Sequence, residues 1–155
     1  MIRNFEEALE LLKNDKSGKA FFSGSKSEEL LSKAEEALSL KFSPMYRKFL
    51  SEFGAGSYGS VEFLDLIDED FEDSCVPDEI WYTLNERQSS NLPNNLVVIY
   101  ETGDGDLYCQ DYNNIDATEP KIVAYSPGVS YPNQMYKVVA QSFGAFLTEK
   151  LNSVI

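Results

Sequence analysis

The chain has 155 residues, the size of one ordinary domain, and 43% of them are hydrophobic, which excludes a wholly disordered protein. It contains no histidine, which excludes Ser-His-Asp and Cys-His catalysis, histidine-ligated zinc sites and imidazole proton shuttles. The formal net charge is −13, from 26 acidic and 13 basic residues, and such a field repels nucleic acid and anionic lipid.

The negative charge is concentrated in the middle of the chain. Residues 49–120 hold 17 acidic residues against one basic residue, Arg87, whereas residues 1–48 hold eight against nine and residues 121–155 hold one against three. Because neighbouring bases cannot neutralise the middle segment, we expect it to attract a basic protein surface or a cation. The alternative is a solvated acidic loop that only keeps the protein in solution.

Apolar and aromatic side chains are interleaved with the acidic residues of this segment. Acidic groups steer a basic partner and aromatic groups anchor it, so the mixture is typical of a protein-binding surface. We predict such a surface in this part of the chain. Its candidate residues are Tyr58, Asp65, Asp68, Glu69, Asp70, Glu72, Asp73, Glu79, Trp81 and Tyr82.

Three amphipathic helices are predicted in the first third of the chain. Asn4–Glu7 and Ser25–Glu28 have the form of capping boxes before apolar residues at helical spacing. The third helix begins at Ser43–Pro44, with a capping hydroxyl and a proline in the first turn, and stops at Gly54.

The pattern then becomes mainly β. Residues 54–59 predict a tight bend before a strand from Val61 to Leu66, and Pro77 opens a brief helix through Leu84. Residues 96–100 and 107–112 predict a hairpin closed by a tight turn at residues 104–105.

The last part of the chain returns to a helix. Residues 122–125 predict a strand, prolines mark the loop that follows, and Ser142 caps a terminal amphipathic helix. Helices at both ends of an antiparallel β region predict an α+β fold, with residues 1–155 forming a single domain.

Three patterns could indicate other chemistry. Asp104, Asp106 and Asp111 could hold a hard cation, but their spacing favours turn chemistry and we predict no metal site. Glu62 and Asp104 could act as a carboxylate pair in a hydrolase, which requires a separation that sequence cannot supply.

The third pattern is the glycine series at positions 54, 56 and 59, which formally matches a dinucleotide fingerprint. It follows a helix and precedes a strand, so no helix N-terminus faces a pyrophosphate, and we predict no cofactor and no small-molecule ligand. The cysteines, Cys75 and Cys109, form no CxxC pair and are expected to be buried free thiols.

The order of several short motifs resembles the SUKH superfamily, which contains bacterial immunity proteins and fungal cell-wall regulators. The motifs are Glu35-x-x-Leu38, Phe42-Ser43-Pro44-x-Tyr46-x-x-Phe49-Leu50, Phe53-Gly54-x-Gly56, Leu92-Pro93, Val97 to Tyr100, Gly103-x-Gly105-Asp106-x-Tyr108 with Asp111, and Ser142-Phe143-x-x-Phe146-Leu147.

The resemblance implies a small α+β domain without catalytic machinery that binds and blocks a toxin, often a nuclease. A nuclease presents a basic surface to phosphates, which agrees with the acidic middle segment. Occlusion of a toxin through residues 65–82 is thus the first hypothesis, and a regulatory scaffold that binds another protein is the second. With no apolar leader and no apolar run longer than a strand, we expect no membrane span and a cytoplasmic location.

Overall fold

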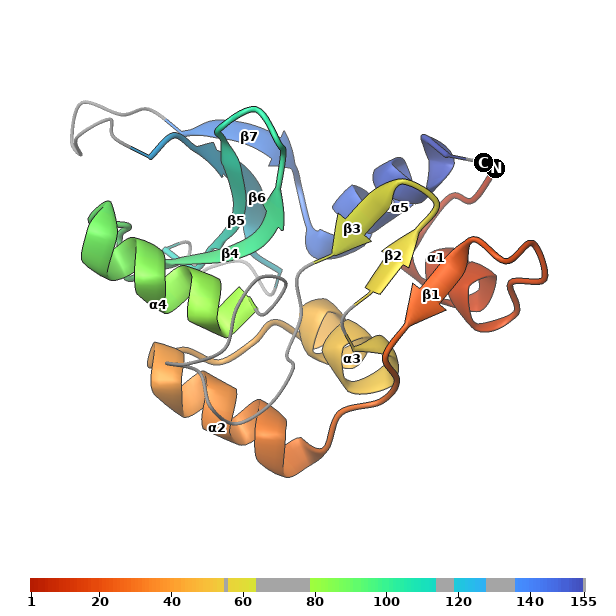
Figure 1. The fold of residues 1–155 in the computed structure, drawn as a ribbon, viewed down its shortest axis with the longest axis horizontal. Coiled ribbons are helices and arrows are strands. Elements are labelled where there is room, and N and C mark those ends of the chain that lie inside the picture. The colour runs from red at the N-terminus through yellow and green to blue at the C-terminus, as the bar shows by residue number, and fades with distance from the viewer. Residues whose placement is uncertain (55, 64–78, 114–118, 128–135, 155) are drawn as a thin grey trace.

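The computed structural model describes residues 1–54, 56–63, 79–113, 119–127 and 136–154 (Figure 1). Helices and antiparallel strands share the described chain, which confirms the predicted α+β class. The elements in chain order are α1 (Phe5–Lys13), β1 (Ala20–Phe22), α2 (Glu28–Leu38), α3 (Pro44–Phe53), β2 (Gly56–Tyr58), β3 (Val61–Phe63), α4 (Glu79–Ser89), β4 (Leu96–Glu101), β5 (Leu107–Asp111), β6 (Lys121–Tyr125), β7 (Lys137–Ala140) and α5 (Phe143–Asn152).

Side-chain caps begin the helices largely as predicted. The side chains of Asn4, Ser43 and Ser142 accept hydrogen bonds from backbone amides three residues further on, at 2.9, 3.3 and 3.1 Å. The cap predicted at Ser25 is wrong, because the hydroxyl of Ser27 performs this role for α2. The amide of Lys26 donates to a carbonyl of α3, which holds the preceding segment against α3 and delays the start of α2.

A small antiparallel sheet has the order β1-β2-β3. The sequence did not indicate β1, and its prediction of a bend over residues 54–59 is wrong for Gly56–Tyr58, which forms β2. A Cβ at Gly56 would lie only 2.2 Å from the carbonyl oxygen of Phe21, so this glycine permits the close pairing of β1 and β2. The predicted strand from Val61 is present through Phe63, and its remainder lies outside the described residues.

A larger antiparallel sheet has the order β4-β5-β6-β7, of which β7 was not predicted. The hairpin of β4 and β5 is confirmed, but its connection is not a two-residue turn. The connection spans residues 102–106, and the positive φ angles belong to Gly103 and Gly105. A register shift between Val98 and Tyr100 leaves Ile99 outside the pairing.

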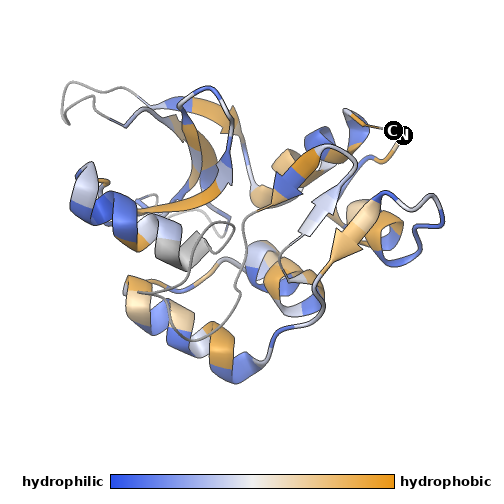
Figure 2. Ribbon diagram, viewed as in Figure 1, coloured by the Kyte–Doolittle hydropathy of each residue, from blue (hydrophilic) through white to orange (hydrophobic). Residues whose placement is uncertain are grey.

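The larger sheet is rich in hydrophobic residues (Figure 2) and contributes buried apolar side chains to two clusters, one on each face. One face packs under α4, which contacts β4, and its buried residues include Val98, Cys109 and Tyr125. The opposite face joins the main core, where α3 and α5 contribute closely packed aromatic rings such as Phe49 and Phe143, whose centroids are 5.1 Å apart. The longest described helices have 11 residues, and none of the described helices is long and apolar enough to cross a bilayer.

A buried polar network joins the start of α3 to the larger sheet. The Gln110 side chain is fully buried, and its amide nitrogen donates to the hydroxyl of Ser43 at 3.1 Å. The Tyr112 hydroxyl donates to the side-chain oxygen of Gln110 at 2.7 Å and accepts from the Ser43 amide at 3.2 Å. The buried Ser43 and Gln110 and the half-buried Tyr112 thus satisfy one another's hydrogen bonds.

A second buried polar residue joins α2 to α3. The side chain of Glu35 is 6% exposed, accepts a hydrogen bond from the amide of Phe42 at 2.8 Å and lies 3.5 Å from Arg47 Nε. The carboxylate therefore fixes the connection between the two helices, because a buried charge without these partners would be costly.

The two ends of the described chain also meet. The amide of Ile2 donates to the side-chain oxygen of Asn152 at 3.1 Å, and the Asn152 side-chain nitrogen donates to the carbonyl of Ile2 at 2.9 Å. The first and last helices, α1 and α5, are in contact, and the termini lie side by side in Figure 1.

Replacing Glu35 tests its structural role. We expect Glu35→Ala to lower the free energy of unfolding by about 2–4 kcal/mol, because the Phe42 amide loses its acceptor and Arg47 keeps only Glu28 of its two carboxylate partners. The matched control Glu36→Ala alters an exposed neighbour and should cost no more than about 0.5 kcal/mol. Urea denaturation at pH 7 measures both losses, and equal losses would contradict the assigned role.

The hydrogen bonds at Gln110 predict that the stability losses of variants at Gln110 and Tyr112 are not additive. We expect Gln110→Leu to cost about 1–3 kcal/mol, since the buried Ser43 hydroxyl and the half-buried Tyr112 hydroxyl each lose a partner. The double variant Gln110→Leu/Tyr112→Phe should lose less than the sum of its two single variants, because each single variant already removes the hydrogen bond between the two side chains. Denaturation curves of the four proteins measure the coupling, and additive losses would show that the two side chains act independently.

Cys109 is expected to be chemically inert in the folded protein. Its side chain is fully buried, and burial raises the pKa of the thiol far above its ordinary value, so almost no thiolate forms at pH 8. Iodoacetamide should leave Cys109 unmodified in buffer and alkylate it in denaturant, as measured by peptide mass spectrometry. Alkylation of the native protein at the rate of a free thiol would contradict the burial.

Candidate protein-binding surface

The structure describes only part of the surface predicted from sequence. Asp65, Asp68, Glu69, Asp70, Glu72 and Asp73 lie outside the described residues. Glu79 and Trp81 lie in the first turn of α4, and their side chains also lie outside the described part. Two candidate side chains remain, those of Tyr58 and Tyr82.

Tyr58 does not lie on the surface. It belongs to the central strand of the small sheet, where it pairs with Ala20 and Val61, and its exposed fraction is 3%. The alternation of β2 turns this ring into the main core. The placement of Tyr58 at a partner-binding surface is therefore corrected, because a core side chain offers a partner almost no area.

Tyr82 is half-buried and packs against the apolar cluster beneath α4. Burial, followed by the negative charges of Glu101 and Glu86, raises the pKa of Tyr82 to about 12. The phenol is therefore neutral at physiological pH, and part of its ring is available to a partner.

Arg87, the one base of residues 49–120, neutralises none of the described acidic groups. Its guanidinium donates to the backbone carbonyls of Leu38 at 3.3 Å and Asn94 at 2.9 Å. Its described bonds thus attach α4 to the end of α2 and to the turn before β4. Burial lowers the pKa of Arg87.

The described carboxylates of the acidic segment fall into two groups. Some have structural roles: Glu52 forms an ion pair with Lys13, and Glu119 accepts a hydrogen bond from the amide of Met45 at the start of α3. Others form no ion pair with any lysine or arginine in the described part of the chain. This second group comprises Glu62, Glu86, Glu101, Asp104, Asp106 and Asp111.

An aromatic cluster lies beside several of these unpaired acids. Tyr100 of β4 is directly opposite Tyr108 of β5, and their partly exposed rings stack with centroids 5.7 Å apart. Phe146 of α5 meets both rings edge-on, at 5.5 and 6.0 Å. One helical turn later, Lys150 places its ammonium 4.7 Å from the Tyr100 centroid and 5.6 Å from the Tyr108 centroid. We call these four residues the tyrosine cluster.

Nearby carboxylates act electrostatically on the two tyrosines of this cluster. The pKa of Tyr108 is raised by burial and then by Asp104, Asp106 and Glu149, and the pKa of Tyr100 by burial, Tyr108 and Glu62. Asp104 itself stays ionised, because hydrogen bonds from Thr102 and the Asp106 amide lower its pKa. The cluster thus combines neutral aromatic faces with a negative surrounding field.

The tyrosine cluster was not predicted, because the predicted hairpin turn gives a different register from the observed loop. A two-residue turn at residues 104–105 would put Tyr108 opposite Glu101, whereas the longer loop puts it opposite Tyr100. Two signals could have found the cluster: the tyrosines lie symmetrically about Asp104, and Phe146 and Lys150 are four residues apart on the predicted last helix.

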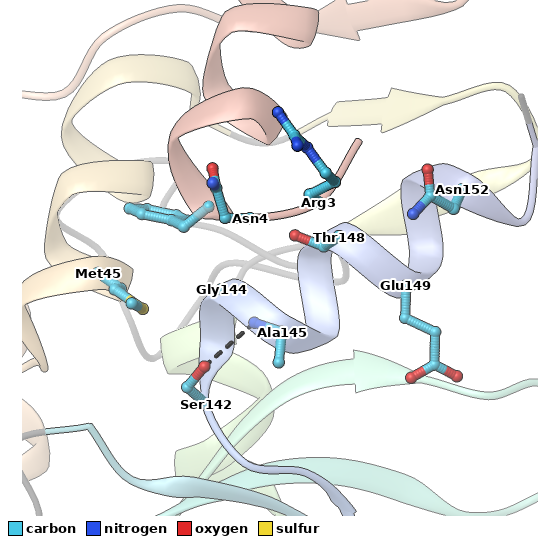
Figure 3. A pocket seen from close by; sticks show the side chains of 10 residues that line it. Arg3, Asn4, Met45, Ser142, Gly144, Ala145, Thr148, Glu149 and Asn152 are labelled. Atoms are coloured by element: carbon cyan, nitrogen blue, oxygen red, sulfur yellow. Dashed lines mark hydrogen bonds between the residues drawn. The ribbon is translucent and has the colours of Figure 1, made fainter. Parts of the chain in front are cut away.

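A groove of about 570 Å³ lies where α1, α3 and α5 meet (Figure 3). Its two charged lining residues are Arg3, which pairs with Glu7 at 3.2 Å, and Glu149. A Cβ at Gly144 would lie 2.8 Å from the Cβ of Phe5, so the glycine allows the helices to approach closely. A single carboxylate cannot supply the acid and base of a hydrolase.

A second groove is lined by Glu35 and Glu36, but the Glu35 carboxylate is bound to Phe42 and Arg47. Neither Glu62 nor Asp104 lines either of these two grooves. In the described residues, no group of three acidic or cysteine side chains could hold a metal ion, the set at 104, 106 and 111 included.

The glycines that resemble a dinucleotide fingerprint serve the backbone. Gly54 ends α3 with a φ of 71°, Gly56 lies within β2, and Gly59 turns the chain into β3 with a φ of 58°. No helix begins after them in the described chain before α4. These positions explain the glycines without a phosphate ligand.

Comparison with known proteins identifies the family. Among solved structures, a protein from Pseudomonas syringae pv. tomato is similar in fold, with a TM-score of 0.59 and 20% identity over 81% of this chain and 86% of that chain. No curated protein matches this sequence. The family model described as SMI1-KNR4 cell-wall (SUKH_5) matches residues 5–152, which is nearly the whole sequence, and the chain therefore belongs to the SMI1-KNR4 (SUKH) family.

Proposed function

We propose that this protein is an immunity protein, which binds a cognate toxin and blocks it without catalysing a reaction. Its family contains immunity and regulatory proteins that act by binding other proteins. The observation that carries the proposal is the excess of negative charge in residues 49–120, which hold 17 acidic residues against one base, Arg87, whose described bonds go to backbone carbonyls. A protein with such a field is suited to a strongly basic partner.

A nuclease domain is the toxin class that fits best. A nuclease must present a cationic surface to a phosphate backbone, so a dense negative surface would compete for the same groove. In our proposal the acidic residues between Asp65 and Glu79 steer the toxin into place, and Trp81 and Tyr82 provide apolar anchors. Tyr58 is left out of this surface because it lies in the core.

The described chemistry supports a non-catalytic role. The chain has no histidine, the thiol of Cys109 is buried, and the carboxylate of Glu35 in the second groove is occupied by structural bonds. A cytoplasmic location would suit a protein that protects the cell that makes it.

The description of the matched family as a cell-wall family favours a second candidate function, in which the chain is a regulatory scaffold for another protein. The two functions differ in genomic context and in phenotype. A neighbouring large toxin gene and rescue of toxin-treated cells indicate immunity, whereas altered cell-wall assembly after deletion indicates regulation.

Charge reversal tests the immunity function. The triple variant Asp68→Lys/Asp70→Lys/Asp73→Lys should weaken binding of the toxin encoded by the adjacent gene by about 10- to 100-fold and flatten its salt dependence. The effect should lie mainly in the association rate, because long-range attraction acts before contact. Surface plasmon resonance at several ionic strengths and rescue of co-expressing cells provide the measurements.

A matched variant distinguishes the effect of charge in residues 65–82 from the effect of the net charge of the protein. Glu6→Lys/Glu10→Lys/Glu36→Lys makes the same change in net charge on exposed helical positions and should alter affinity by no more than about threefold. Equal losses in the two variants would remove residues 65–82 as the docking surface. Failure of the wild-type protein to bind or protect against the adjacent toxin would remove the immunity function itself.

A further inference from the structure

We propose that the tyrosine cluster is a binding site for a basic side chain of the partner, an arginine or lysine, and that Lys150 occupies this site in the unbound protein. The inference rests on the proposed function in one respect, that the partner presents a basic surface. It adds a specific recognition site on a part of the chain far in sequence from the acidic residues 65–73.

The rings already hold a cation. The Lys150 ammonium lies 4.7, 5.6 and 5.8 Å from the centroids of Tyr100, Tyr108 and Phe146, all within the range of a cation–π contact. Lys150 forms no ion pair with a described carboxylate, although Glu149 and Glu62 influence the same rings. Its ammonium is therefore held by aromatic faces.

The site that Lys150 occupies on the rings is accessible to an incoming basic side chain. Tyr100, Tyr108 and Lys150 are all partly exposed, so an incoming side chain can reach the rings from solvent. Lysine carries its charge on a flexible four-carbon stem and can move aside without changing the backbone of α5. The displaced ammonium would then lie near Glu149 and the acidic hairpin loop, which compensate its charge.

Charge complementarity identifies the occupant as a cation. Glu62, Asp104, Asp106 and Glu149 act on the tyrosine rings, and Lys150 is the one base among the residues in ring contact. Across the sheet, Tyr108 is followed by Ala124 and then by Lys137, so one further base lies at the far side of this face. The four acids leave the site negative even with both lysines counted.

An arginine of the partner is better suited to this site than a lysine. Its planar guanidinium stacks on an aromatic face and can donate to a carboxylate in the same plane, and it is more weakly hydrated than an ammonium. Tyr100 and Tyr108 are nearly parallel, with 25° between their planes, and together present a broad face. A basic nuclease surface supplies arginines in abundance.

The first experiment removes the internal competitor. Lys150→Gln should tighten binding of the toxin domain encoded by the adjacent gene by about 3- to 10-fold, because the rings are then vacant. Lys48→Gln removes the same charge from an exposed position on α3, which contributes no residue to the cluster, and should change affinity by less than about twofold. Isothermal titration calorimetry measures both.

The second experiment removes the ring. Tyr100→Leu should weaken binding by about 5- to 30-fold, whereas Tyr100→Phe, which keeps the aromatic face, should stay within about twofold. In the Tyr100→Leu background, Lys150→Gln should lose most of its effect, because both changes act on one contact. Thermal unfolding of each variant confirms that it is folded.

A probe other than the toxin tests the cation site separately from the immunity function. A hexa-arginine peptide should shift the ring signals of Tyr100 and Tyr108 in NMR spectra of the full chain, and Tyr100→Leu should reduce the shift at Tyr108. Shifts at these rings without toxin binding would support the cation site and refute the proposed function. Unchanged ring signals, or toxin affinity unaffected by every variant in the cluster, would overturn the cation site and leave the immunity function standing.

Discussion

The start of α3 is fixed to the larger sheet by the hydrogen bonds between Ser43, Gln110 and Tyr112. The Ser43 hydroxyl also caps α3, so one side chain both begins the helix and attaches it to β5. These groups are largely withdrawn from water, and each would be costly without its partner. The helix can therefore take only a narrow range of positions. Because α3 supplies many of the central aromatic rings, the packing of α5 and of the small sheet depends on this attachment.

The sequence was most informative where a local signal is sufficient. Side-chain caps and apolar spacing predicted the helices that begin after Asn4, Ser43 and Ser142, since these signals involve atoms within one turn. It failed for β1 and β7, which are three and four residues long and too short to show alternation. The predicted cap of α2 was Ser25 and the observed cap is Ser27, because hydrogen bonds from the preceding segment to α3 determine where α2 begins.

For the candidate surface too, features local in sequence could be predicted, whereas features that depend on contacts distant in sequence could not. The concentration of acids could be counted in the sequence, and the structure adds that Arg87 is bonded to backbone carbonyls. Tyr58 was misassigned because the existence of β2, and therefore the direction of its side chains, depends on pairing with β1. The tyrosine cluster joins residues of β4, β5 and α5. Tyr100 and Tyr108 are opposite each other because the loop between β4 and β5 is longer than the two-residue turn that Asp-Gly predicts.

The hydrogen bonds between Ile2 and Asn152 bring the beginning and the end of the described sequence together. The last helix also supplies Phe143, Phe146 and Leu147 to the main core. A nascent polypeptide whose α5 is still inside the ribosome lacks these side chains, so its earlier helices cannot complete their packing until α5 emerges. Completion of the core thus requires α5, and a product truncated before this helix would leave its apolar surface open to chaperones and proteases.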